Sequence, residues 1–97
     1  MVFPYVFAKT FEKNLKRIKK SGKWDQIRKK IEDILDQPNS VGEEKSYILK
    51  GCRSAKMGHY VIVWRVREGT VYFLACDIHD DAYAAAQKEA RELWRGE

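Results

Sequence analysis

The clearest hydrophobic pattern in the chain lies between residues 50 and 83. The run Tyr60–Val66 is β-branched or aromatic almost throughout, which favours a strand over a helix. Its apolar residues fall on both faces, as expected for a central strand of a sheet covered on at least one side. Gly69 can adopt a positive φ, so residues 67–70 predict a tight turn, and Val71–Ile78 returns as the partner strand.

The first part of the chain predicts a short strand and two amphipathic helices. Tyr5–Ala8 is the strand, and Thr10 is the expected N-cap of the first helix. Ser21 and Gly22 separate the helices, and the second ends before Pro38 because the residue preceding proline avoids the helical region. The two apolar stripes have helical spacing: Phe11, Leu15 and Ile18 in the first, and Trp24, Ile27, Ile31, Ile34 and Leu35 in the second.

Three further segments complete the predicted order. Residues 39–45 are a polar loop, Ser46–Ala55 is a strand containing Gly51, and Ala82–Trp94 has helical composition. Asp80 or Asp81 can cap this last helix. The pattern predicts one α+β domain over residues 1–97, of order β-α-α-β-β-β-α, with a helical hairpin packed on a mainly antiparallel four-stranded sheet.

Strand register decides which side chains share a face. If Glu68 and Gly69 form a two-residue turn, Asp77 lies opposite Tyr60 on the face that also carries Ile62, Trp64 and His79. Arg65 then faces the other way. A slip of one residue reverses this arrangement.

Composition narrows the choice of partner. Hydrophobic residues make up 44% and aromatic residues 12% of the 97 residues, which is typical of a folded domain. No apolar run is long enough to span a bilayer, and the N-terminal segment lacks signal-peptide features, so we expect a cytoplasmic protein without a membrane partner. Nineteen Lys and Arg against fourteen Asp and Glu give a net charge of +5, which favours RNA, DNA or an acidic protein as partner.

The two cysteines predict neither a disulfide scaffold nor a metal site. Cys52 and Cys76 lie in different predicted strands and have no CxxC spacing, so free buried thiols are expected. A zinc site that adds His59 and His79 fits no familiar ligand spacing. We therefore expect no metal and no small-molecule cofactor.

Basic residues form two groups. The larger group is explained most simply as the solvated face of the two helices, with nucleic-acid contact as the alternative; it contains Lys13, Lys16, Arg17, Lys19, Lys20, Lys23, Arg28, Lys29 and Lys30. The second group lies in or beside strands, where charges need a specific reason to be accommodated; it contains Lys50, Arg53, Lys56 and Arg65.

Three short motifs follow one another in the second half: Leu49-Lys50-Gly51-Cys52-Arg53, Lys56-Met57-Gly58-His59-Tyr60 and His79-Asp80-Asp81-Ala82-Tyr83. In this order they resemble the RelE/ParE superfamily of toxins from type II toxin–antitoxin systems. That superfamily combines a helical hairpin with a Leu-x-Gly-x-Arg strand, a Gly-x-Tyr-Arg strand and a His-containing segment ending in Tyr. The His-Asp-x-x-Tyr ending is most similar to an archaeal subset of the RelE branch.

The resemblance implies a microbial RNase-like fold, cleavage of mRNA on the ribosome or inhibition of gyrase, and neutralisation by a cognate antitoxin. Arg53 matches the family's strand arginine, Lys56 a basic position before the glycine turn, and His79 and Tyr83 the C-terminal pair at the RNA site. One position departs from the pattern. The arginine that usually follows the Gly-x-Tyr tyrosine is Val61 here, so a cation often used on the scissile phosphate is missing and another side chain, Arg53 or Arg65, must replace it.

RNA cleavage by side chains alone needs proton transfer and stabilisation of a phosphorane. His79 is the motif-matched group that exchanges protons near neutral pH, and Tyr83, one helical turn on, can stack on a base or orient the phosphate. Arg53, supported by Lys50 or Lys56, would hold the phosphate, and Arg65 is a further RNA-binding candidate. In the plainer alternative, His79 is an ion-pair partner at a helix start and Tyr83 belongs to the core.

Three functions therefore remain open. The first is a ribosome-dependent endoribonuclease that acts through Arg53, His79 and Tyr83 on mRNA. The second is a ParE-like gyrase inhibitor, or a toxin relic that binds its partner without cutting RNA. The third is a small basic RNA-binding domain whose strand charges act only electrostatically.

Overall fold

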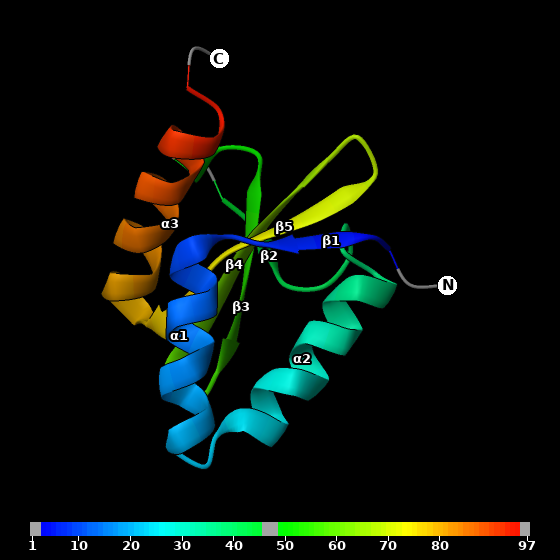
Figure 1. Ribbon diagram of the computed structural model, residues 1–97. Helices are drawn as coiled ribbons and strands as arrows, with labels where there is room; N and C mark the ends of the chain where they lie inside the picture. Colours follow the sequence, from blue (N-terminus) through cyan, green and yellow to red (C-terminus); the bar gives the residue numbers. More distant parts are fainter. Residues whose placement is uncertain (1–2, 46–48, 96–97) are drawn as a thin grey trace.

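The strands and helices follow one another in nearly the predicted order (Figure 1). A computed structural model describes residues 3–45 and 49–95. Its elements are β1 (Tyr5–Phe7), α1 (Lys9–Lys20), α2 (Trp24–Asp36), β2 (Glu43–Glu44), β3 (Cys52–Met57), β4 (Tyr60–Arg67), β5 (Thr70–Ile78) and α3 (His79–Leu93). The α+β class is confirmed. The sheet has five strands rather than four, because the expected polar loop 39–45 contains the two-residue strand β2.

The strands form one mixed sheet of order β1-β5-β4-β3-β2. β1 runs parallel to β5, and every other neighbouring pair is antiparallel. Side chains of α1 and α2 pack on one face of the sheet, which we call the hairpin face. Side chains of α3 pack on the other, the α3 face. β4 is therefore covered on both sides, which explains why its sequence is apolar on both faces.

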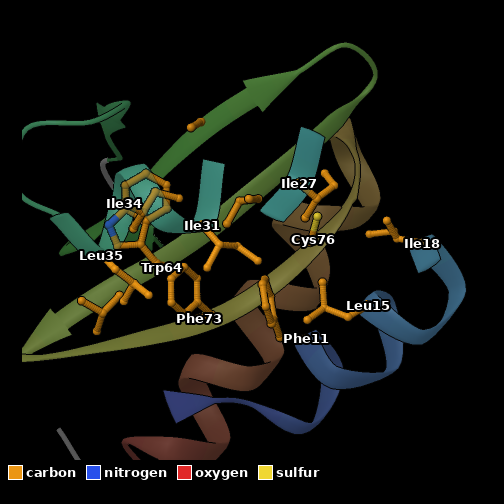
Figure 2. Packing of buried hydrophobic residues seen from close by; sticks show 13 residues of the cluster. Phe11, Leu15, Ile18, Ile27, Ile31, Ile34, Leu35, Trp64, Phe73 and Cys76 are labelled. Atoms are coloured by element: carbon orange, nitrogen blue, oxygen red, sulfur yellow. The ribbon is translucent and has the colours of Figure 1, made fainter. Parts of the chain in front are cut away.

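Two apolar clusters hold these layers together. The hairpin-face cluster joins Trp64 and Phe73 of the sheet to the predicted stripes of α1 and α2 (Figure 2). The α3-face cluster contains smaller side chains: Cys52, Val61, Val63, Leu74, Ala75, Ala82 and Ala86. Alanines at the contact let α3 lie close to the strands. The sheet therefore has a larger apolar cluster on the hairpin face, under two helices, and a smaller one on the α3 face, under one helix.

The β4–β5 hairpin has the predicted turn but not the predicted register. Glu68 and Gly69 both have positive φ, 50° and 76°, as a two-residue turn of the primed type requires. Trp64 pairs with Phe73, but Val63 pairs with Ala75, so β5 carries an extra residue. Beyond this bulge the partner of Tyr60 is Ile78 and that of Val61 is Asp77. The predicted pairing of Asp77 with Tyr60 is wrong because the bulge shifts the register by one residue.

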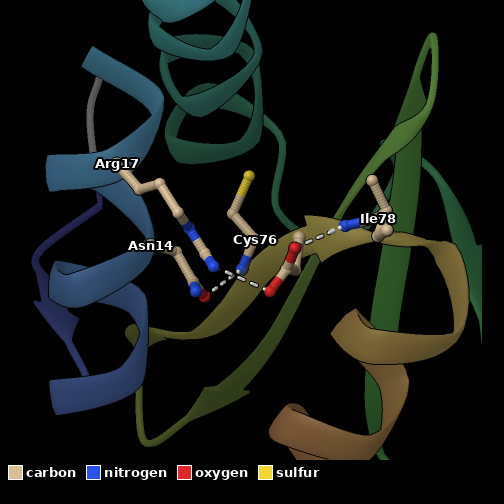
Figure 3. Close-up of polar contacts among 5 residues, drawn as sticks. Asn14, Arg17, Cys76 and Ile78 are labelled. Atoms are coloured by element: carbon tan, nitrogen blue, oxygen red, sulfur yellow. Dashed lines mark hydrogen bonds and ion pairs between the residues drawn. The ribbon is translucent and has the colours of Figure 1, made fainter. Parts of the chain in front are cut away.

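The free edge of β5 is completed by α1. β1 pairs with β5 only as far as Phe73, so the later part of β5 has no strand on that side. Asn14 is buried, and its Oδ1 accepts a 3.0 Å hydrogen bond from the backbone N–H of Cys76 (Figure 3). One turn further on, Arg17 donates to Asp77 Oδ2 at 2.9 Å. The Asn14 bond satisfies a backbone donor that would otherwise be buried without a partner, and the Arg17 ion pair adds a second link between α1 and β5.

Several predicted boundaries differ from those observed. α1 begins at Lys9 and its N-cap is Ala8, whereas Thr10, the predicted cap, donates its hydroxyl to the buried Glu89 of α3. α3 begins at His79 instead of Ala82, with both aspartates in its first turn. The strand predicted at Ser46–Ala55 begins only at Cys52, and its residues 46–48 lie outside the described residues.

Candidate active site

The candidate site lies on the α3 face, where the first two turns of α3 approach Lys45, just after β2. Side chains of a strand alternate between faces, so Lys56 projects on the same face as the buried residues Cys52 and Ser54. Tyr83, in the second turn of α3, packs half-buried against the α3-face cluster. A tyrosine and a strand lysine therefore share this face.

Two side chains approach the Tyr83 ring. The His79 ring stands edge-on to the Tyr83 ring, with centroids 5.0 Å apart and an interplanar angle of 86°. Lys45 places its Nζ 4.7 Å from the centroid of the same ring. We call His79, Tyr83 and Lys45 the Tyr83 cluster. It unites a group that can transfer protons, a hydroxyl-bearing aromatic ring and a cation.

The local sequence explains this arrangement. His79 and Tyr83 are four residues apart on one helix, so they project from the same side of α3. Lys45 follows β2, and its backbone N–H donates a 2.9 Å hydrogen bond to the carbonyl of Cys52. This bond holds the end of β2 against β3 and brings the lysine over Tyr83. The position of Lys45 was missed by sequence reasoning, because nothing in the segment 39–45 indicates that it pairs with a strand.

His79 is open to solvent and has an acidic neighbour. Its side chain is 55% exposed, and its Nδ1 lies 3.2 Å from Asp80 Oδ1. It lines a shallow depression together with His59, Ile78, Asp80 and Asp81. A carboxylate at this distance can hold the ring in one orientation by accepting a hydrogen bond from it. The ring is thus reachable by a ligand and can act as an acid or a base.

Arg53 does not join the Tyr83 cluster. It pairs with Trp64 across β3 and β4, so its side chain lies on the hairpin face. Its Nε donates to the carbonyl of Val41 at 3.0 Å and its Nη2 to that of Gly42 at 3.1 Å. Its Nη1 lies 3.7 Å from Glu44, and the side chain is only 15% exposed. The guanidinium therefore holds the segment before β2, and its role as a phosphate ligand stays a prediction.

The remaining basic candidates lie along the same end of β3 and β4. The Arg65 guanidinium is 4.7 Å from the Trp94 ring, and a Cβ on Gly51 would lie 3.2 Å from its Nε, so Arg65 is packed between the two. Lys50 is exposed and lines a depression of about 720 Å³ that Lys45 also lines. Arg65 and Lys50 are thus closer to the Lys45 side of the site than to His79.

The cysteines do not form a metal centre. Cys52 belongs to the α3-face cluster and Cys76 to the hairpin-face cluster, and both are free and buried. Burial raises the pKa of Cys52, and burial together with the nearby Asp77 raises the pKa of Cys76 to about 12. Among the described residues, no three or more His, Cys, Asp or Glu side chains gather in a way that could hold a metal ion.

The fold places this chain among small α+β domains, and comparisons with known proteins identify its family. A family model described as the ParE toxin of the type II toxin–antitoxin system parDE matches residues 5–83. The chain therefore belongs to the ParE toxin family, within the RelE/ParE superfamily that its motifs predict. No curated protein matches the sequence.

Three solved structures illustrate the likeness. The toxin–antitoxin complex RelBE2 from Mycobacterium tuberculosis aligns with a TM-score of 0.68 at 22% identity, covering 81% of this chain and 100% of that one. A YoeB/ParE toxin from Agrobacterium tumefaciens aligns with a TM-score of 0.70 at 13% identity, covering 78% and 98%. A double-arginine mutant of the Escherichia coli toxin RelE in the free state aligns with a TM-score of 0.68 at 21% identity, covering 91% and 97%. At these identities the likeness establishes the fold.

Across residues 3–45 and 49–95, the structure contains no helix with the length and apolar character needed to cross a membrane.

Proposed function

We propose that this toxin is a ribosome-dependent endoribonuclease that cleaves mRNA and so inhibits translation. The observation that carries the proposal is the Tyr83 cluster, in which His79 and Lys45 approach one tyrosine ring from different elements. Such a cluster on an accessible face is what RNA cleavage by side chains requires.

In the proposed reaction, the 2′-OH of a bound nucleotide attacks the adjacent phosphorus. A base removes the 2′-OH proton, the 5′-oxygen leaves and takes up a proton, and a 2′,3′-cyclic phosphate and a 5′-OH remain. His79 transfers one of these protons. Tyr83 offers its hydroxyl to the phosphate or its ring to a base. In this proposal the side chains of the protein carry out every step, and no cofactor takes part.

Lys45 takes the place of the arginine that the family pattern leads one to expect at Val61. Val61 is 1% exposed and lies in the α3-face cluster, so it supplies packing and no charge. Lys45 and Lys56 bring ammonium groups to the same face and, in this proposal, stabilise the phosphorane. Lys50 and Arg65 hold the RNA strand further along the face. Arg53 contributes by holding the segment that carries Lys45.

The proposed partners follow from this role. The similar RelBE2 structure is a toxin–antitoxin complex, and the family to which the chain belongs is defined by such pairs. We infer that a cognate antitoxin protein binds and neutralises this toxin. Since its substrate would be mRNA on the ribosome, the toxin would act in the cytoplasm.

The proposal is tested by induced expression in a bacterial host, with growth measured and mRNA 5′ ends mapped. Wild type should arrest growth and create new 5′ ends inside reading frames. His79→Ala should lower cleavage by roughly 10²–10⁴-fold, the usual contribution of a general acid or base. His59→Ala is the control: His59 lines the same depression as His79, so this variant shows whether the loss of any histidine there lowers cleavage. Cleavage that survives in His79→Ala would refute the assignment.

A gyrase inhibitor is the second candidate, and the match to the ParE family model favours it. In that case the toxin would arrest growth without new mRNA 5′ ends, and purified protein would block DNA supercoiling by gyrase. No arrest from folded protein would instead indicate a relic that only binds its partner.

A further inference from the structure

The positive charge of the chain is concentrated on the helical hairpin, away from the candidate active site. Residues 9–30 contain ten Lys or Arg and two Asp or Glu, a net charge of +8, while the remaining residues carry −3. α1 and α2 cover the hairpin face, whereas the Tyr83 cluster lies on the α3 face. Apart from Arg17, which reaches Asp77 at the edge of β5, this charge lies on other elements than the Tyr83 cluster and needs its own explanation.

Four lysines of α1 form a single row. Lys9, Lys13, Lys16 and Lys20 are spaced four, three and four residues apart and are all exposed. At 100° per residue they fall within about 60° of one another, directly opposite the buried stripe of α1. The row is roughly 16 Å long at a rise of 1.5 Å per residue. We call it the lysine row.

The solvated face of α1 explains polar side chains at these positions, but not four like charges in one row. Within the described parts of the chain, no ion pair involves any of its four lysines, whereas the neighbouring Arg17 is paired with Asp77 (Figure 3). Like charges one turn apart destabilise a helix, and Lys9, the first residue of α1, also opposes the helix dipole. Repulsion within the row thus opposes the helix, and only Lys20, in the last turn, complements the dipole.

We propose that the lysine row binds the phosphate backbone of duplex RNA and forms a docking surface separate from the active site. Backbone phosphates are recognised by regularly placed cations without apolar anchors. Lysine is depleted from protein–protein interfaces, where aromatic residues and arginine are the usual anchors, and the row contains none of these. An RNA backbone therefore fits the row better than an acidic protein does.

This inference stands whether or not His79 cleaves RNA. The test measures binding of purified protein to an RNA duplex of about 16 base pairs by fluorescence anisotropy over a salt series. One variant replaces all four lysines of the row by glutamine. The matched control removes the same charge elsewhere, replacing Lys23, Lys29, Lys88 and Arg91 by glutamine, all of them exposed.

Neutralising the row should weaken the binding of duplex RNA by at least about tenfold. The slope of log K against log salt concentration should become shallower by about 3 to 4, because four phosphate contacts are lost. The control should bind within about threefold of wild type, because its charges lie outside the row. His79→Ala should bind duplex RNA as wild type does, which separates docking from cleavage. Thermal unfolding should show the row variant at least as stable as wild type, because repulsion has been removed.

Two results would overturn the proposal. Equal weakening in both quadruple variants would mean that net charge alone is responsible, and unchanged RNA binding in the row variant would mean that the row does not contact RNA. Unchanged RNA binding together with lost binding to the cognate antitoxin would assign the row to a protein partner instead.

Discussion

Replacing Arg53 with methionine tests whether the role of this arginine is structural or catalytic. Methionine keeps the length and apolar stem of the side chain but removes both hydrogen bonds to the carbonyls of Val41 and Gly42. The bond to Val41 is partly buried and charge-assisted, which makes it worth about 1.5–3 kcal/mol, while the exposed bond to Gly42 adds about 0.5 kcal/mol. We expect a loss of about 2 kcal/mol of unfolding free energy, or a fall in Tm on the order of 10 °C.

The assay is urea unfolding followed by tryptophan fluorescence, with Arg28→Met as the matched control. Arg28 forms an exposed ion pair with Glu32 at 3.0 Å, so its loss should change stability by only about 0.3 kcal/mol. Arg53→Met should also lower RNA cleavage, because the segment carrying Lys45 loosens. Wild-type stability combined with lost cleavage would refute this reasoning and identify Arg53 as a phosphate ligand.

Two further predictions concern the buried Cys76 and the tightly packed Gly42. Burial raises the pKa of the Cys76 thiol from the ordinary value of 9.0 to about 12 in the folded protein. As the pH rises, the unfolded chain therefore loses this proton before the folded chain does. The free energy of unfolding should fall by about 1.4 kcal/mol per pH unit between the two values. Cys76→Ala lacks this pH-dependent contribution. The difference in unfolding free energy between wild type and Cys76→Ala, measured by urea unfolding, should therefore shrink as the pH rises. A constant difference would contradict the prediction. Gly42→Ala should be far more destabilising than Gly22→Ala in the same assay. Both glycines have positive φ, but a Cβ on Gly42 would lie 2.2 Å from the Ser54 carbonyl oxygen, whereas a Cβ on Gly22 meets nothing within 4 Å. The strain at Gly22 is worth about 1 kcal/mol and overpacking at Gly42 should add about 1–3 kcal/mol, and equal losses would argue against the close approach.

Much of the fold could be predicted because burial imposes a period on the sequence. The stripes of α1 and α2 follow the helical period, and the apolar character of β4 on both faces indicates a strand between two layers. The β5 bulge left no such signal, because Phe73, Leu74, Ala75 and Cys76 are all apolar and fit either register.

The candidate site was only partly predictable, because some of its side chains come together through helical spacing and others through strand pairing. His79 and Tyr83 are close in sequence, so helical spacing alone brings them together. Lys45 reaches Tyr83 only through the pairing of β2 with β3. The register places Arg53 on the hairpin face, where its guanidinium binds two carbonyls of the segment before β2. When distant segments meet through backbone hydrogen bonds, the residue types alone do not indicate the contact.

The most direct test of the central claim is cleavage of an mRNA bound to purified ribosomes by the purified toxin, comparing wild type with His79→Ala and His59→Ala. Wild type and His59→Ala should cut within the reading frame and leave 5′-OH ends, while His79→Ala, equally folded by circular dichroism, should be slower by roughly 10²–10⁴-fold. Equal cleavage by all three proteins, or none by folded wild type, would contradict the account.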